Sequence, residues 1–162
     1  MQIERSSNLL RKITVLVVFC FFVLPAHAKY GGGSGTSQYP YLIYDANHMQ
    51  AIGADANDWD KHFKLMADVN LADLAEPNFN VIGNGFYPFT GVFDGGGHRI
   101  WNMTHSSAGE YEVGLFGFVF NGQIEDLGLI NPEIDARTNS IVGSLIGSLM
   151  DGTLSRCYAA GG

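Results

Sequence analysis

Cysteine is nearly absent from this sequence, which excludes a disulfide framework. The 162 residues include two cysteines, Cys20 and Cys157. Cys20 lies in an N-terminal leader that we expect to be removed, so Cys157 has no intramolecular partner. No histidine is positioned by the sequence to activate a lone thiol, and we predict that Cys157 is buried as a small apolar side chain.

The N-terminal apolar run is too short to cross a membrane. Ile13–Leu24 has 12 residues, whereas a spanning helix needs about 20. Basic residues precede this run and Ala26-His27-Ala28 follows it, which is the order of a secretory signal peptide. We predict a signal peptide over residues 1–28, cleavage between Ala28 and Lys29, no membrane span after cleavage, and a secreted or cell-surface protein.

Positive charge is scarce. Beyond residue 28 the chain has 6 Lys and Arg against 15 Asp and Glu, a net charge of −9 with histidine neutral. Nucleic acids and anionic membranes are bound through clustered lysine and arginine. The sequence has no such cluster, so we expect no nucleic-acid partner.

The region after the leader divides into three parts. Residues 29–40 form a Gly/Ser-rich lead-in that we expect to be loosely held. Residues 41–78 form an N-terminal cap, with a helix over Ala46–Ile52 that ends at Gly53 and a strand over His62–Val69. Residues 79–162 contain short apolar pieces separated by Gly, Asn and Asp turns, and no helical period. The strands predicted there are Asn80–Ile82, Gly91–Phe93, Arg99–Met103, Val113–Val119, Gln123–Ile130, Ile141–Leu149 and Thr153–Tyr158.

An internal repeat determines the expected architecture. The segment from Val113 recurs from Val142, with offsets of 29 residues at Gly114/Gly143 and 30 at Gly122/Gly152. A fixed period of this size is typical of a solenoid, because each coil buries its apolar side chains only by stacking on its neighbours. An antiparallel sandwich, the rival fold, gives no reason for this recurrence. We predict two inward ladders, one of Ile100, Ile124 and Leu154 and the other of Met103, Leu127 and Cys157.

The repeat resembles the GLUG motif of large bacterial secreted and surface proteins. Two copies carry this resemblance, through Val113, Gly114, Leu115 and Gly117, and through Val142, Gly143, Leu145 and Gly147. The second copy departs from the first by placing Ser144 between Gly143 and Leu145. Proteins similar to immunoglobulin A peptidases and filamentous adhesins contain such repeats. The resemblance implies an all-β, right-handed parallel β-helix at a bacterial surface, and it provides no catalytic site to transfer.

Two groups of polar residues are candidates for chemistry, and a structural role is expected for both. Asp94 and His98 flank a triple glycine, where Asp94 can bond the amides of a tight corner and His98 can start the next strand. The patch Asp55, Asn57, Asp58 and Asp60 lacks the glycine and the third ligand of an EF-hand loop. We therefore predict turns and solvated loops here, and no metal or other cofactor.

Histidines and aromatic residues outside these groups are also expected to be structural. We predict that His48, His62 and His105 lie at the surface or at strand edges. Four aromatic residues cluster in the sequence near one corner, and burial in the core is favoured over stacking on sugars. They are Phe86, Tyr87, Phe89 and Trp101.

These observations favour a secreted or surface solenoid with an adhesin-like, binding or structural role, whose ligand is a carbohydrate or a protein. A carbohydrate-active lyase or hydrolase is the alternative, and it requires acids converging on one face of adjacent coils. The acids available are Asp94, Glu125, Asp126, Glu133 and Asp135. We also expect the chain to be the non-catalytic N-terminal part of a larger surface protein, or another chain to cover its C-terminal edge.

Overall fold

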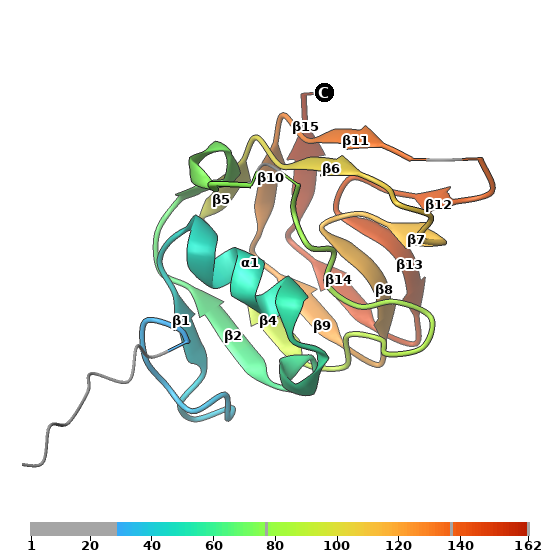
Figure 1. The fold of residues 1–162 in the computed structure, drawn as a ribbon. Coiled ribbons are helices and arrows are strands. Elements are labelled where there is room, and N and C mark those ends of the chain that lie inside the picture. Colours follow the sequence, from blue (N-terminus) through green and yellow to red (C-terminus); the bar gives the residue numbers. More distant parts are fainter. Residues whose placement is uncertain (1–28, 77, 137, 162) are drawn as a thin grey trace, which may run out of the picture.

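The computed structural model describes residues 29–76, 78–136 and 138–161. The predicted signal peptide and Ala28 lie outside these residues. In the described part the chain winds into a stack of coils made of short parallel strands, with one α-helix lying across the space that the strands enclose (Figure 1). This confirms the predicted all-β, parallel β-helix.

The elements are short, and one α-helix and two 3-10 turns precede most of the strands. Helix α1 spans Ala46–Ala54, and the 3-10 turns η1 and η2 span Ala56–Asp58 and Leu71–Asp73. The early strands are β1 Tyr41–Ile43, β2 His62–Leu65, β3 Val69–Asn70, β4 Val92–Asp94, β5 Arg99–Trp101, β6 Thr104–Ser106, β7 Glu112–Val113 and β8 Phe116–Phe120. The later strands are β9 Gln123–Glu125, β10 Gly128–Ile130, β11 Glu133–Asp135, β12 Ile141–Val142, β13 Ile146–Met150, β14 Thr153–Ser155 and β15 Tyr158–Ala160.

Every strand pair that the structure describes is parallel, and the sheets run along the stack. The order is β1-β2-β4-β9-β14 in the first sheet, called sheet A here, and β15-β10-β5-β3 in the second, called sheet B. Three two-stranded sheets, β11-β6, β12-β7 and β13-β8, complete the coils. Sheet A includes β1 and β2, so the stacking of parallel strands begins within the segment predicted as the cap.

The register confirms part of the predicted ladders and corrects the rest. Ile124 lies beside Leu154 in the next coil, as predicted, but its partner in the preceding coil is Phe93. Ile100 pairs instead with Leu129, in sheet B. The prediction was wrong because it aligned the segment after Gly97 with β9, whereas Gly91 is the glycine that precedes the strand in register with β9. For the same reason Met103, which follows β5, does not stack on Leu127, which precedes β10, the strand that pairs with β5.

Left-handed corners divide strands that the sequence predicted as continuous. Asp126 (φ 53°) separates β9 from β10, and Arg156 (φ 53°) separates β14 from β15 one coil later. Asn121 and Asp151 occupy another pair of equivalent corners at φ 55° and 54°. Non-glycine residues rarely adopt this conformation, and asparagine and aspartate adopt it most readily. Because each of these two pairs occupies equivalent positions in successive coils, the left-handed corners recur at the period of the coil.

Aromatic side chains fill the centre of the stack. Phe63, Phe93 and Phe116 are fully buried, with ring centroids 6.4 Å apart between Phe63 and Phe93 and 5.5 Å apart between Phe93 and Phe116. Phe89 packs on Phe116 at 5.1 Å. Such rings contribute large apolar areas as well as favourable tilted contacts, so they dominate the stability of this core.

Helix α1 covers the N-terminal end of the core, as predicted, but extends further than expected. Asp45 caps it by accepting a hydrogen bond from the His48 amide at 2.9 Å, and Met49 and Ile52 are fully buried. The helix continues past Gly53 to Ala54. A Cβ at Gly53 would collide with the backbone of Asn80, so this glycine permits a close approach and does not end the helix.

The Gly/Ser-rich lead-in is held against β1. The Gly31 amide donates to the Leu42 carbonyl, and the Leu42 amide donates to the Gly32 carbonyl, each at 2.9 Å. Tyr30 is buried against Tyr41, with ring centroids 4.6 Å apart. The lead-in is therefore part of the N-terminal cap, which corrects the expectation that it is loosely held.

Candidate functional site

The outer face of sheet A brings polar side chains from successive coils into columns. Lys64, Asp94 and Glu125 are register partners on β2, β4 and β9. With His62 they line a hollow of about 440 Å³. The Lys64 ammonium lies 2.9 Å from the Asp94 carboxylate. Two of the acids required by the enzyme alternative therefore lie on neighbouring strands, but Asp94 is engaged by a lysine.

The Asp94 corner confirms the predicted structural role. The Asp94 carboxylate accepts the Gly96 amide at 2.8 Å, across the triple glycine. The His98 ring lies 3.2 Å from Asp68, which also accepts the Arg99 amide at 3.0 Å. Asp94 and His98 are thus held by different partners and do not form a pair.

A cluster of charged residues joins the last two corners between sheets A and B. Asp126 and Arg156 occupy equivalent left-handed corners, and the Arg156 guanidinium contacts both oxygens of Asp126 and reaches Glu125 at 2.9 Å. The hydrogen bond from Arg156 holds the pKa of Asp126 below its usual range. Glu125 and Asp126 face outward, and through Arg156 they tie one coil to the next.

This contact predicts a dependence on Arg156 that NMR can measure. In Arg156→Gln the pKa of the Asp126 carboxyl should rise toward its ordinary value, because the charge-assisted bond that favours the ionised form is lost. Asp126 contributes stability above its unfolded pKa and loses it as the pH falls through the lowered folded pKa. A carboxyl ¹³C titration measures the shift, with Lys61→Gln as the control. An unchanged Asp126 pKa in Arg156→Gln contradicts the assignment.

The carboxylates of the acidic patch near η1 are bound by other side chains of the protein. Lys29 lies 2.7 Å from Asp55 and 2.5 Å from Asp58, and the Tyr30 hydroxyl donates to Asp58 at 2.9 Å. The hydrogen bond from Lys29 lowers the pKa of Asp55 to about 2. Throughout residues 29–76, 78–136 and 138–161, no group of three or more His, Cys, Asp or Glu side chains is placed to hold a metal ion.

The glycines of the repeat motif lie where backbones from neighbouring coils meet. A Cβ on Gly114 would come within 2.6 Å of the Gly143 carbonyl oxygen, and one on Gly147 within 2.7 Å of the Gly117 carbonyl oxygen. Real Cβ atoms do not approach so closely, so a side chain at these positions would push the coils apart. The motif thus encodes the close stacking of coils.

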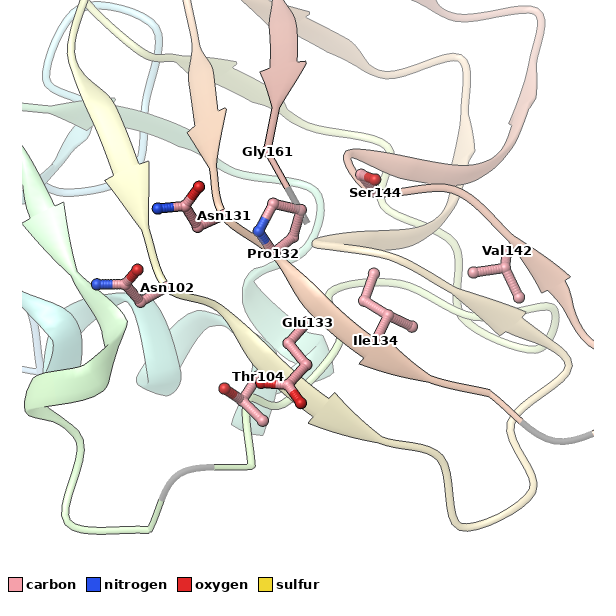
Figure 2. A pocket seen from close by; sticks show the side chains of 9 residues that line it. All are labelled: Asn102, Thr104, Asn131, Pro132, Glu133, Ile134, Val142, Ser144 and Gly161. Carbon is pink, nitrogen blue, oxygen red and sulfur yellow. The ribbon is translucent and has the colours of Figure 1, made fainter.

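A further hollow lies at the last coils and is lined by two asparagines, Asn102 and Asn131. Asn102 and Asn131 occupy left-handed corners at φ 53° and 50°, and Gly161 follows at φ 78° (Figure 2). The Asn102 side-chain nitrogen donates to the Asn70 side-chain oxygen at 2.9 Å, which joins these two side chains across neighbouring strands of sheet B. The hollow has a volume of about 840 Å³, and Glu133 is its one acid among the described lining residues.

Apolar side chains of the last coil are uncovered in the described part of the chain. Leu154 is 44% exposed, although its register partner Ile124 is fully buried. The other exposed apolar residues of this coil are Ile141, Val142, Leu149, Met150 and Tyr158. Cys157 is half-buried against the core, and burial raises the pKa of its thiol, so the prediction of full burial was too strong.

The structure places two groups of residues differently from the sequence-based expectation. His105 is buried rather than at the surface, and its ring lies 2.8 Å from the Phe79 carbonyl oxygen. Phe86 and Tyr87 are exposed, whereas Phe89 is buried as expected. The Asn84-Gly85 turn signal before Phe86 could have indicated an exposed loop. Trp101 is half-buried on sheet B, away from this loop in the fold.

Two known proteins are similar to this chain. Halomucin of Haloquadratum walsbyi is 34% identical over 134 residues, which cover 80% of this chain and 1% of halomucin. A putative Gly-rich membrane protein of Evansella cellulosilytica is 29% identical over 155 residues, 86% of this chain and 18% of that protein. The chain thus spans a small part of the relatives that it matches.

The other comparisons give no match. No protein-family model matches the sequence, and no solved structure matches the fold. None of the helices in the described residues is long and apolar enough to cross a bilayer. The parallel solenoid and the two relatives are compatible with a structural module of a surface protein.

Proposed function

We propose that this chain is a GLUG-like solenoid module of an exported protein, which acts at the cell surface as a structural spacer that also binds a ligand in an adhesin-like manner. The signal sequence, the mature net charge of −9 and the names of its two relatives support this location.

The observation that carries the proposal is the pairing of outward charges between coils. Lys64 binds Asp94 across β2 and β4, and Arg156 binds Glu125 and Asp126 across the last two coils. Most of the carboxylates on the sheet A face are thereby used to hold neighbouring coils together. Such pairing favours an extended, stable surface, although each exposed pair contributes little alone.

Surface exposure of the protein in its source cells tests the location. Antibodies raised against residues 29–161 should label intact cells, and an external protease should remove the label without lysing them. The expected result follows because the solenoid is exported and displayed on the outside. Detection of the antigen only inside protease-treated intact cells would contradict the proposed location.

The sheet A hollow is the specific observation behind the enzyme alternative. Asp94 and Glu125 lie on neighbouring parallel strands, which are about 4.8 Å apart in proteins. Two carboxylates close together on one face are the arrangement that glycosidic chemistry requires. The Lys64–Asp94 pair opposes this role because it fixes the carboxylate in an ion pair.

A turnover assay separates the two functions. The exported chain is incubated with neutral and acidic polysaccharides, with and without calcium, and reducing ends and unsaturated products are measured. We expect no turnover above the blank. Turnover that is lost in Asp94→Asn but kept in Asp60→Asn would replace the structural proposal, because Asp60 is an exposed acid outside the hollow.

A further inference from the structure

Two loops from different coils place exposed aromatic rings beside one hollow. The loop before β4 carries Phe86, which is 92% exposed, and the segment before β7 carries Tyr111, which is 58% exposed. Both residues line a hollow of about 480 Å³, together with Asn84, Glu110 and Glu112. Exposed apolar side chains that are grouped around one hollow, unlike single ones, are typical of ligand-binding sites.

The first loop is held in a fixed shape by Asn84. Its side-chain oxygen accepts hydrogen bonds from the backbone amides of Phe86 at 2.9 Å and Tyr87 at 3.0 Å. Its backbone amide donates to the Tyr87 carbonyl oxygen at 2.8 Å. The Phe86 ring is therefore presented by a tight, hydrogen-bonded turn. A ligand that stacks on this ring would lose little affinity to the ordering of the loop.

The second loop is held by Glu110. Its carboxylate accepts the Ser107 hydroxyl at 2.7 Å and the Gly109 amide at 3.1 Å. Burial opposes its ionisation, but the hydrogen bonds from the Ser107 hydroxyl and from backbone amides outweigh burial and lower the pKa of the Glu110 carboxyl. Glu110 thus positions the loop that presents Tyr111.

The hollow also offers a carboxylate, that of Glu112, which can accept hydrogen bonds from the hydroxyl groups of a ligand. No hydrogen bond or ion pair engages the Glu112 carboxylate among the residues that the structure describes. A second hollow of about 240 Å³ shares Asn84, Glu110 and Glu112 with the first, and His105 also lines it. The two hollows therefore share these three lining side chains and are together called the double hollow here.

His105 contributes an unused acceptor to the second hollow. It is 3% exposed, and because its Nδ1 faces the Phe79 carbonyl oxygen at 2.8 Å, that nitrogen carries the proton. With that tautomer the Nε2 atom is an acceptor. It lies 3.9 Å from the Glu110 carboxylate, beyond hydrogen-bond distance, and it is the one buried side-chain nitrogen or oxygen of the described residues without a hydrogen-bond partner. Such an atom is costly to leave unsatisfied unless a ligand or water reaches it.

We propose that this double hollow binds a neutral saccharide, whose ring faces stack on Phe86 and Tyr111 while its hydroxyls donate to Glu112 and to His105 Nε2. Flat aromatic faces match the C–H faces of sugar rings, and free acceptors match a ligand rich in O–H donors. The inference gives a ligand class to the binding role proposed above and rests on that role. Its test in solution does not depend on where the protein is located.

Binding of defined tetrasaccharides to the exported chain tests the proposal. The probes are tetramers of β-1,4-linked glucose, α-1,4-linked glucose and β-1,4-linked N-acetylglucosamine, followed by ¹⁵N NMR titration. At least one tetramer should shift the amide signals of residues 84–87 and 109–112. Phe86→Ala and Tyr111→Ala should each weaken its binding about 5- to 10-fold, from the loss of one stacking contact. Glu112→Gln should weaken it as well, through the lost acceptor.

The controls distinguish a saccharide from other ligands. Tyr39→Ala removes a tyrosine that is equally exposed but distant from the hollow in the lead-in, and it should leave the affinity unchanged. Tetralysine tests a cationic ligand, which the acidic rim could attract. The proposal is overturned if no tetramer shifts these signals, if the aromatic variants bind as the wild type does, or if tetralysine binds more tightly than every tetramer.

Discussion

Replacement of Phe93 by alanine should lower the free energy of unfolding by about 3–5 kcal/mol. Phe93 is fully buried in β4, and its ring packs between Phe63 at 6.4 Å and Phe116 at 5.5 Å. The change removes the apolar area of the ring and leaves a cavity that coils on both sides can fill only in part. Since a whole domain is stable by about 5–15 kcal/mol, this single change removes a large share of the total.

Urea denaturation followed by circular dichroism measures this loss. Phe86→Ala is the matched control, because the same atoms are removed from a side chain that is 92% exposed. The control should change the unfolding free energy by less than about 0.5 kcal/mol. Equal effects of the two substitutions would show that Phe93 does not lie in the core of the solenoid.

Replacement of Gly117 by alanine should lower the free energy of unfolding by about 1–3 kcal/mol or more. Gly117 belongs to the first repeat motif and lies in β8. An added Cβ would come within 2.5 Å of the Gly83 carbonyl oxygen and 2.8 Å of the Glu112 carbonyl oxygen. Both atoms are backbone atoms, so the added methyl group can be accommodated only by moving whole segments of the coil.

Gly85→Ala provides the comparison for this prediction. The nearest atom to a Cβ at Gly85 is a carboxylate oxygen of Glu112 at 3.3 Å, and this flexible side chain can move aside. Its effect on the denaturation midpoint should be small. A midpoint for Gly117→Ala that equals the wild-type value would mean that the motif glycines do not determine the spacing between coils.

The repeat in the sequence was sufficient to predict the architecture, because the stacking of coils is what makes residue types recur at a fixed interval. Equivalent positions in successive coils have the same surroundings, so the same residue types recur about every 30 residues, as at Gly114 and Gly143. The prediction of the Ile124 and Leu154 contact follows from this and is confirmed. The placement of Ile100 in the same ladder was wrong, because glycines precede two successive strands, at Gly91 and at Gly97, and sequence alone does not show which of these strands lies in register with β9.

The candidate sites were harder to predict than the fold, because they depend on contacts between residues far apart in the sequence. The corner role of Asp94 could be predicted, because its partner Gly96 is two residues away. The ion pairs of Arg156 with Glu125 and Asp126 could not, since they join residues about 30 positions apart. The hollow beside Phe86 likewise required a second loop, which begins more than 20 residues later.

The sequence by itself predicted an export signal and determined the excess of acidic residues and the winding of a parallel solenoid, because composition and a 29–30-residue period are local or repeated properties. Only the tertiary structure decided which aromatic side chains are core and which are surface: Phe93 is buried and Phe86 is exposed, although each lies within two residues of a glycine and beside a β-forming residue. The physical reason is that burial depends on what the next coil places above a side chain. Leu154 shows this directly, since it occupies the same inward position as Ile124 but has no described coil beyond it.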